Sequence, residues 1–105
     1  MIAKTPTPPY YSVIFTSERT KGENGYTEMA DRMLELASKQ SGFLGAESAR
    51  NEIGITVSYW KSLDAIKLWK MNMEHIEAQR KGIKEWYKRY KVRIAKVERD
   101  YDFGL

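Results

Sequence analysis

The feature that most constrains the fold is the way in which the chain alternates between two spacings of its apolar residues. Four segments carry the β-branched and aromatic runs typical of strands: Tyr10–Ser17, Phe43–Arg50, Ile55–Trp60 and Lys91–Glu98. Between them, two segments that begin near Tyr26 and Leu63 repeat apolar residues every three or four positions, as an amphipathic helix does. The resulting order, βαββαβ, predicts an α+β, ferredoxin-like fold in which both helices cover one face of a four-stranded antiparallel sheet.

Local signals predict where the helices begin and end. Gly42 is positioned to end the first helix in a left-handed conformation. Ser62 is a good N-cap for the second helix. The apolar stripe of the second helix continues as far as Tyr90, which is too long for one simple helix. We therefore expect a break at Asn72 or Gly82.

The length of 105 residues suits one small domain. All three prolines lie within residues 1–9, which we expect to form a flexible arm before a single domain over residues 10–105. The absence of cysteine excludes a disulfide framework and a thiolate metal site. The chain lacks an apolar run near the ~20 residues of a membrane span and lacks the apolar core of a secretory signal. We therefore expect a cytoplasmic protein without a membrane partner.

Apolar residues on both sides of the predicted strands indicate that both faces of the sheet are covered. In the first strand, Val13 and Phe15 lie on one side, while Tyr10 and Ile14 lie on the other. The two helices can cover only one of these faces. Because the chain has no further segment to cover the second face, we predict a homodimer whose sheets pack face to face.

Three segments resemble the antibiotic biosynthesis monooxygenase family of dimeric α+β barrels: QSGFLGAESAR (40–50), ITVSYWKSLDAIKLWK (55–70) and HIEAQRKGIKEWYKRY (75–90). The resemblance implies a dimeric α/β barrel with a small-molecule pocket in each protomer, between the sheet and the helices. The family includes cofactor-independent oxygenases of polyketide anthrones and quinols, haem-degrading oxygenases, and members without a proven reaction. The resemblance also implies that Trp69 lines the pocket.

The residues that would bind haem depart from the pattern of the haem-degrading members. Those members use a histidine on the second helix to ligate iron, and the matching position here is Gln79. His75 lies four residues earlier, about one helical turn away. The amide-bearing residue of the first strand in those members corresponds to Phe15 or Thr16. Haem binding or degradation is therefore the less favoured alternative.

His75, the only histidine, is the leading candidate for a catalytic base. Oxygenation without a cofactor requires deprotonation of a phenolic substrate, and a neutral imidazole, whose ordinary pKa is about 6.5, suits that task. We therefore expect a cofactor-independent monooxygenase acting on a small aromatic or quinone-like molecule. Two alternatives stay open: a non-catalytic small-molecule-binding or interaction protein of the same fold, and a His75 that is only a surface or capping residue. The sequence has no spacing typical of a metal site or a phosphate-binding loop.

Four further residues are candidates for substrate binding. Trp69 and Trp86 could stack on a flat ligand, or they could simply pack in the core. Tyr59 could donate a hydrogen bond to a ligand oxygen, or it could be a buried tyrosine with a backbone partner. Arg50 could stabilise an oxyanion, or it could pair with a glutamate or lie exposed.

Residues 80–99 carry nine of the 18 Lys and Arg residues, which raises the alternative of a nucleic-acid partner. The predicted central strands lack the aromatic pattern that RNA-recognition modules present, and a dimer would hide that face. We therefore expect no nucleic-acid partner. The basic residues up to Arg89 are expected on the solvated side of the second helix, and the others along the last strand.

Overall fold

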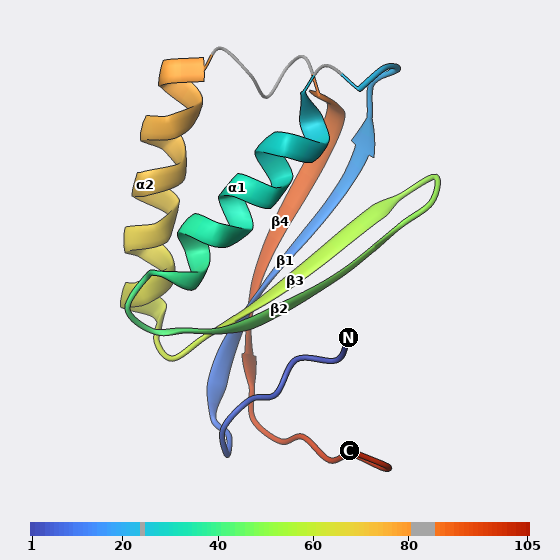
Figure 1. Ribbon diagram of the computed structural model, residues 1–105. Helices are drawn as coiled ribbons and strands as arrows, with labels where there is room; N and C mark the ends of the chain where they lie inside the picture. The colour runs from blue at the N-terminus through green and yellow to red at the C-terminus, as the bar shows by residue number, and fades with distance from the viewer. Residues whose placement is uncertain (24, 81–85) are drawn as a thin grey trace.

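The computed structural model describes residues 1–23, 25–80 and 86–105, except for the side chains of residues 75–80. The elements follow the expected order (Figure 1): β1 (Tyr10–Arg19), α1 (Tyr26–Ser38), β2 (Phe43–Arg50), β3 (Gly54–Trp60), α2 (Leu63–Arg80) and β4 (Tyr87–Val97). The strands form one antiparallel sheet in the order β2-β3-β1-β4, and both helices lie on the same side of it. The α+β, ferredoxin-like prediction is confirmed.

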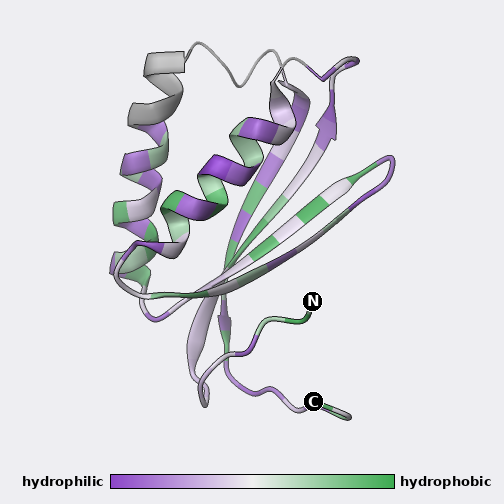
Figure 2. Cartoon of the chain, viewed as in Figure 1, coloured by the Kyte–Doolittle hydropathy of each residue, from purple (hydrophilic) through white to green (hydrophobic). Residues whose placement is uncertain are grey.

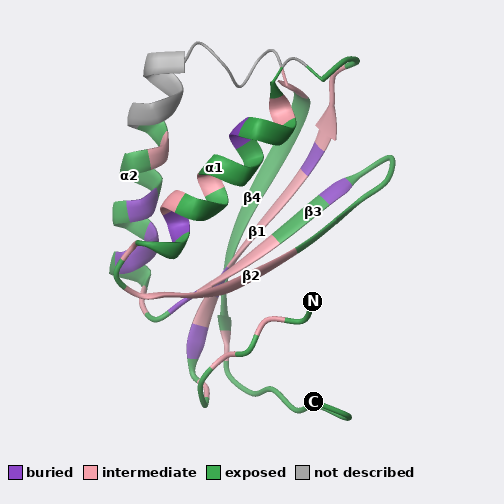
Figure 3. Ribbon diagram, viewed as in Figure 1, coloured by how far each residue is buried: buried purple, intermediate pink, exposed green. Residues whose placement is uncertain are grey.

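The side of the sheet that carries the helices is called here the helix face. Tyr11 and Val13 of β1 pack against the buried side chains of both helices. Residues paired across an antiparallel sheet point to the same side, so Trp60, which pairs with Tyr11, belongs to this face. Trp60 is fully buried, and its ring stacks on that of Trp69 in α2 with the centroids 6.0 Å apart. Among the side chains of α2 that the structure describes, the buried ones are Ala65, Ile66 and Trp69, in its N-terminal half (Figure 3).

Helix α1 is amphipathic, as the alternating bands of Figure 2 show, and it ends before Gly42. Its C-cap is Lys39, whose backbone is right-handed, so the prediction that Gly42 directly ends the helix is wrong. Gly42 does take the left-handed conformation, with φ +88°, three residues later in the turn that leads into β2. A Cβ at this position would lie 2.7 Å from the Cβ of Ala65, so glycine allows α2 to approach the turn.

Helix α2 begins as expected and runs past the first of its two predicted breaks. The Ala65 amide donates to the Ser62 hydroxyl at 3.1 Å, which confirms the N-cap. The helix runs without interruption through Asn72, so a break at Asn72 is wrong. The Asn72 side-chain amide donates to the side-chain oxygen of Gln40 at 3.0 Å, so it joins the helix to the end of α1. Gly82, the other predicted break, lies outside the described residues.

Strand β4 begins at Tyr87, four residues before the predicted strand start. Lys88 and Arg89, expected on the helix, therefore lie in the strand. Pairing with the long strand β1 decides this, because Glu18 lies opposite Arg89 and forms an ion pair with it at 2.8 Å. Tyr87 and Tyr90, whose spacing favoured a helix, instead contact Phe15 of β1. Their ring centroids lie 5.4 Å and 5.2 Å from that of Phe15.

The opposite side of the sheet, called here the outer face, carries both ends of the chain. Residues 1–9 form neither helix nor strand, but the Ala3 amide donates to the Glu47 carboxylate at 2.9 Å. The Tyr10 hydroxyl donates to Asp100 at 2.5 Å, which ties the start of β1 to the segment after β4. None of the helices among the described residues is long and apolar enough to cross a membrane.

Candidate functional site

The helix face is covered unevenly. Helix α1 contacts β2 and α2 contacts β3, and on this side Trp60 of β3 is 0% exposed. Three helix-face residues of β4 are apolar yet open: Tyr90 is 47% exposed, Val92 45% and Ile94 52%. Their register partners on β1 include Phe15, which is half-buried beside Val92. These four residues, Phe15, Tyr90, Val92 and Ile94, are called the β4 apolar surface.

A group of polar and aromatic side chains borders one end of the β4 apolar surface, where β1 ends and α1 and β4 begin (Figure 1). The guanidinium carbon of Arg19 lies 3.5 Å from the ring centroid of Tyr26, and that of Arg50 lies 5.7 Å from it. The Tyr26 ring meets the ring of Tyr87 edge-on at 5.8 Å. Together with Ser17, these residues are called the arginine–tyrosine cluster.

The sheet register positions Arg50 in this cluster. Arg50 of β2 and Ser17 of β1 both pair with Gly54 of the intervening strand β3. Since Gly54 has no side chain, Arg50 can cross β3, and its Nη2 donates to the Ser17 hydroxyl at 2.5 Å. A Cβ built on Gly54 would clash with the Arg50 guanidinium. The glycine therefore provides the space that the guanidinium occupies.

The electrostatics of the cluster favour an anion. Burial, and then a hydrogen bond to Tyr26, raise the pKa of Tyr87, so its phenol is neutral at physiological pH, while the two arginines oppose this shift. Arg19 donates from Nε to the Trp86 carbonyl at 3.0 Å and from Nη2 to the Gly22 carbonyl at 3.0 Å. Among the side chains that the structure describes, neither Arg19 nor Arg50 has a salt bridge. The cluster is thus positively charged and lined by hydroxyl groups.

The predicted site residues lie in different environments. Trp69 is 8% exposed and belongs to the core, where it stacks on Trp60. Trp86 immediately precedes β4 and is half-buried, and its carbonyl accepts hydrogen bonds from Arg19 and from the Thr20 amide. Arg50 is part of the arginine–tyrosine cluster. His75 belongs to helix α2, but its side chain lies outside the described residues, as does that of Gln79.

Tyr59 lies on the outer face, and the structure does not bring it together with Trp69 or Arg50. Its hydroxyl donates to the Glu47 carboxylate at 2.5 Å. Burial, and then this hydrogen bond, raise the pKa of Tyr59 to about 12. The same bond, with that from the Ala3 amide, lowers the pKa of Glu47. Glu47 is the acidic residue of β2, the strand that also carries Arg50. Its carboxylate is bonded to Tyr59 and forms no ion pair with Arg50.

Sequence reasoning did not single out Ser17, Arg19, Tyr26 or Tyr87. Tyr26 and Tyr87 read as ordinary members of apolar stripes, and Arg19 falls in a polar segment beyond the predicted first strand. The available signal was the hairpin turn at residues 51–54, which sets the register that aligns Arg50 with Gly54. The pairing of Gly54 with Ser17 is long-range, so this turn does not predict it.

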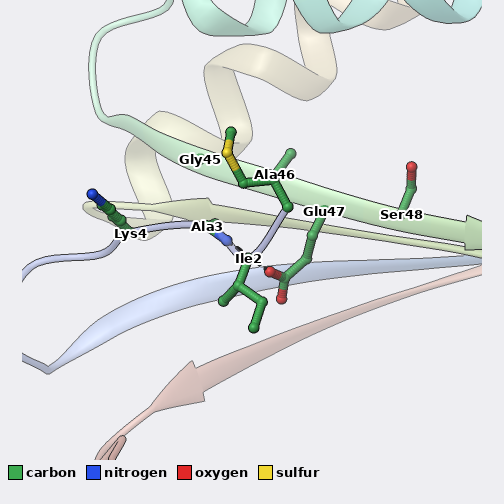
Figure 4. A pocket seen from close by; sticks show the side chains of 8 residues that line it. Ile2, Ala3, Lys4, Gly45, Ala46, Glu47 and Ser48 are labelled. Carbon is green, nitrogen blue, oxygen red and sulfur yellow. Dashed lines mark hydrogen bonds between the residues drawn. The ribbon is translucent and has the colours of Figure 1, made fainter. Parts of the chain in front are cut away.

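A groove of about 540 Å³ lies elsewhere, between residues 1–4 and residues 45–48 (Figure 4). Its carboxylate, Glu47, already accepts hydrogen bonds from Ala3 and Tyr59. Part of its wall is the chain before β1 rather than the folded sheet. The groove therefore offers less directed chemistry than the arginine–tyrosine cluster. Within the described part of the chain, no three His, Asp or Glu side chains gather as metal ligands would.

No family model matches the chain. The uncharacterised protein YqjZ of Bacillus subtilis (strain 168) is 53% identical over 100 residues, which cover 93% of this chain and 88% of YqjZ.

Solved structures share the fold at low sequence identity. A conserved protein from Methanosarcina mazei Go1 aligns with a TM-score of 0.67 and 11% identity, over 88% of this chain and 94% of that chain. A proposed antibiotic biosynthesis monooxygenase from Bacillus cereus aligns with a TM-score of 0.61 and 16% identity, over 91% and 100% of the two chains.

Proposed function

Because this chain belongs to the same family as the Bacillus protein YqjZ, we propose for it an activity that its fold and its open helix face support together. It binds a small planar aromatic or quinone-like molecule and oxygenates it without a cofactor. The observation that carries the proposal is an exposed apolar strip on the helix face that ends at a positively charged cluster. The likeness in fold to a proposed antibiotic biosynthesis monooxygenase supports the class of reaction.

The two parts of the site bind different parts of such a ligand. The aromatic ring lies against Val92 and Ile94, whose exposed apolar area is removed from water on binding. An acidic oxygen of the ligand faces the guanidinium of Arg50, which favours the ionised form of that oxygen. The neighbouring aromatic residues, including Trp86, border the ligand, and Trp69 supports the site from the core. Tyr59, on the outer face, has no part in this binding mode.

The proposed reaction uses the substrate's own anion. A base removes a proton from the methylene carbon of an anthrone, and the resulting anion is oxidised by O₂. One oxygen atom becomes the new carbonyl, and the other leaves as water with the two methylene hydrogens, so an anthrone and O₂ give an anthraquinone and water. Among the chain's residues, we assign the role of base to His75, whose ordinary pKa lies near neutral pH.

A non-catalytic ligand-binding protein is the second candidate, and one observation favours it. The titratable groups described in the arginine–tyrosine cluster are guanidiniums and phenols, and burial raises the pKa of Tyr87. Neither kind of group is an effective base near pH 7. This candidate predicts binding of the aromatic molecule without consumption of O₂.

Turnover of 1,8-dihydroxyanthrone tests the enzymatic proposal. We expect the protein to accelerate its conversion to 1,8-dihydroxyanthraquinone, with one O₂ consumed per molecule and no product under anaerobic conditions. His75→Ala should reduce kcat by about 100-fold or more, the usual contribution of a general base. Wild-type protein that binds the anthraquinone but oxidises the anthrone no faster than buffer would leave only the binding function.

We also propose that two copies associate through the outer face and form a dimeric α/β barrel. Ile14 and Val57 are half-buried paired residues on this face, and Ile55 beside them is 44% exposed. Ile55→Lys should shift the mass measured by light scattering from dimer towards monomer. Leu68→Lys, at an exposed position of α2, should not. A monomeric wild-type protein at micromolar concentration would contradict this proposal. The cytoplasmic location stays a prediction.

A further inference from the structure

Two arginines converge on one tyrosine ring, and neither of them has a salt bridge among the described side chains. The guanidinium carbons of Arg19 and Arg50 lie 3.5 Å and 5.7 Å from the ring centroid of Tyr26. Like charges held this close repel each other, and surface arginines usually relieve such repulsion by pairing with carboxylates. Among the described residues, the ion pairs join carboxylates to Lys39, Lys70 and Arg89, and none joins a carboxylate to Arg19 or Arg50. Hydrogen bonds from Thr27, and then the charge of Arg19, lower the pKa of Glu23, whereas no described carboxylate pairs with Arg50. A bound anion would supply negative charge at Arg50.

The hydrogen bonds of the two arginines distinguish their roles. Arg19 is held in place by backbone carbonyls, because it donates to Trp86 and to Gly22. Arg50 has one described bond, from Nη2 to the neutral hydroxyl of Ser17. A guanidinium has five N–H donors, so Arg50 is held in position while most of its donors have no described partner. Arg19 therefore supplies charge, and Arg50 supplies charge together with available hydrogen bonds.

We propose that the arginine–tyrosine cluster is a subsite for a carboxylate group carried by the aromatic ligand. A planar guanidinium donates two parallel hydrogen bonds to a carboxylate, and the second positive charge of Arg19 strengthens the attraction. The β4 apolar surface begins at this point, since the ring centroid of Tyr87 in the cluster lies 5.4 Å from that of Phe15 and 6.1 Å from that of Tyr90. An aromatic carboxylate thus matches both parts, with its ring on β4 and its charged group at Arg50. The inference rests on the proposed binding of an aromatic molecule to the helix face.

A matched pair of probes isolates the carboxylate. The dyes 1,8-dihydroxyanthraquinone-3-carboxylate and 1,8-dihydroxyanthraquinone have the same ring system and differ in one charged group. Their Kd values can be measured by quenching of tryptophan fluorescence or by calorimetry. We expect the carboxylate to bind about tenfold more tightly or better, with an advantage that falls as salt is added.

Three variants test whether Arg50 is responsible. Arg50→Gln should remove most of the carboxylate's advantage, because it should weaken binding of the carboxylate dye much more than binding of the uncharged dye. Gly54→Ala should have the same effect without removing any charge, because the new Cβ occupies the space of the Arg50 guanidinium and displaces it. Arg32→Gln removes one charge from an exposed position of α1, away from both proposed surfaces, and should leave both Kd values unchanged. Circular dichroism checks that each variant is folded.

The possible outcomes separate the two proposals. Equal affinity of wild-type protein for the two dyes overturns the carboxylate subsite and leaves the aromatic site standing. An equal loss for both dyes in Arg50→Gln also overturns it. The same holds if Arg32→Gln loses as much of the carboxylate's advantage as Arg50→Gln, since the effect would then be general. Failure of both dyes to bind overturns the proposed function and the subsite together.

Discussion

Replacement of Gly42 by alanine is expected to destabilise the protein through two separable effects. The first is conformational, because Gly42 has φ +88° and a residue with a Cβ loses about 1–2 kcal/mol in the left-handed region. The second is steric, since the new Cβ would lie 2.7 Å from the Cβ of Ala65 at the start of α2. Overpacking of this kind costs about 1–3 kcal/mol. The expected loss in the free energy of unfolding is thus about 2–5 kcal/mol.

Gly25 provides a control for the conformational effect alone. Its φ is +77°, and a Cβ at this position would have no heavy atom within 4 Å. Gly25→Ala should therefore cost only about 1–2 kcal/mol. Both variants can be measured by urea unfolding followed by tryptophan fluorescence and by far-UV circular dichroism, with the midpoints compared at equal m-values.

The variant Ala65→Gly tests the steric effect directly. It removes the Cβ that the new side chain would meet, so Gly42→Ala should be less destabilising in this background than in the wild type. The difference is a coupling energy of about 1–3 kcal/mol. The reasoning is refuted if Gly42→Ala and Gly25→Ala are equally destabilising, or if the Ala65→Gly background leaves the cost of Gly42→Ala unchanged.

Three further predictions concern other contacts. Hydrogen bonds from Tyr59 and from the Ala3 amide lower the pKa of Glu47, so the stability that its carboxylate contributes is complete above the ordinary pKa of 4.5 and is lost as the pH falls through the lowered value. The Tm difference between wild type and Glu47→Gln should therefore narrow between pH 7 and pH 3, and a constant difference would contradict this account. Ser62→Ala removes the N-cap of α2 and should cost about 1 kcal/mol in urea unfolding, whereas no change would mean that the cap contributes nothing. Because Gln79 stands where haem-degrading relatives have histidine, added haem should keep the Soret band of free haem, and a shifted band would restore the haem alternative.

Much of the architecture could be predicted because it depends on local patterns. The hairpin strand Phe43–Arg50 has the predicted bounds, and the Ser62 cap is where its residue type indicated. The start of β4 could not be predicted in this way. Its aromatic residues also fit a helical repeat, and pairing with β1 decided between the two. Asn72, similarly, is weak as a helix former but is held in α2 by packing and by its bond to Gln40.

The candidate site depends on the tertiary structure more than the fold does. The sequence alone determined the βαββαβ order, the apolar character of both sheet faces and the presence of aromatic residues and Arg50, because these follow from residue type and periodicity. Tertiary structure alone decided that Tyr59 faces away from the helices and that Trp69 lies in the core. It also decided that Arg50 crosses Gly54 to reach Ser17. The physical reason is that the sheet register brings Arg50 to Ser17, 33 positions away in the sequence. A shift of one residue in this register would turn each side chain to the other face.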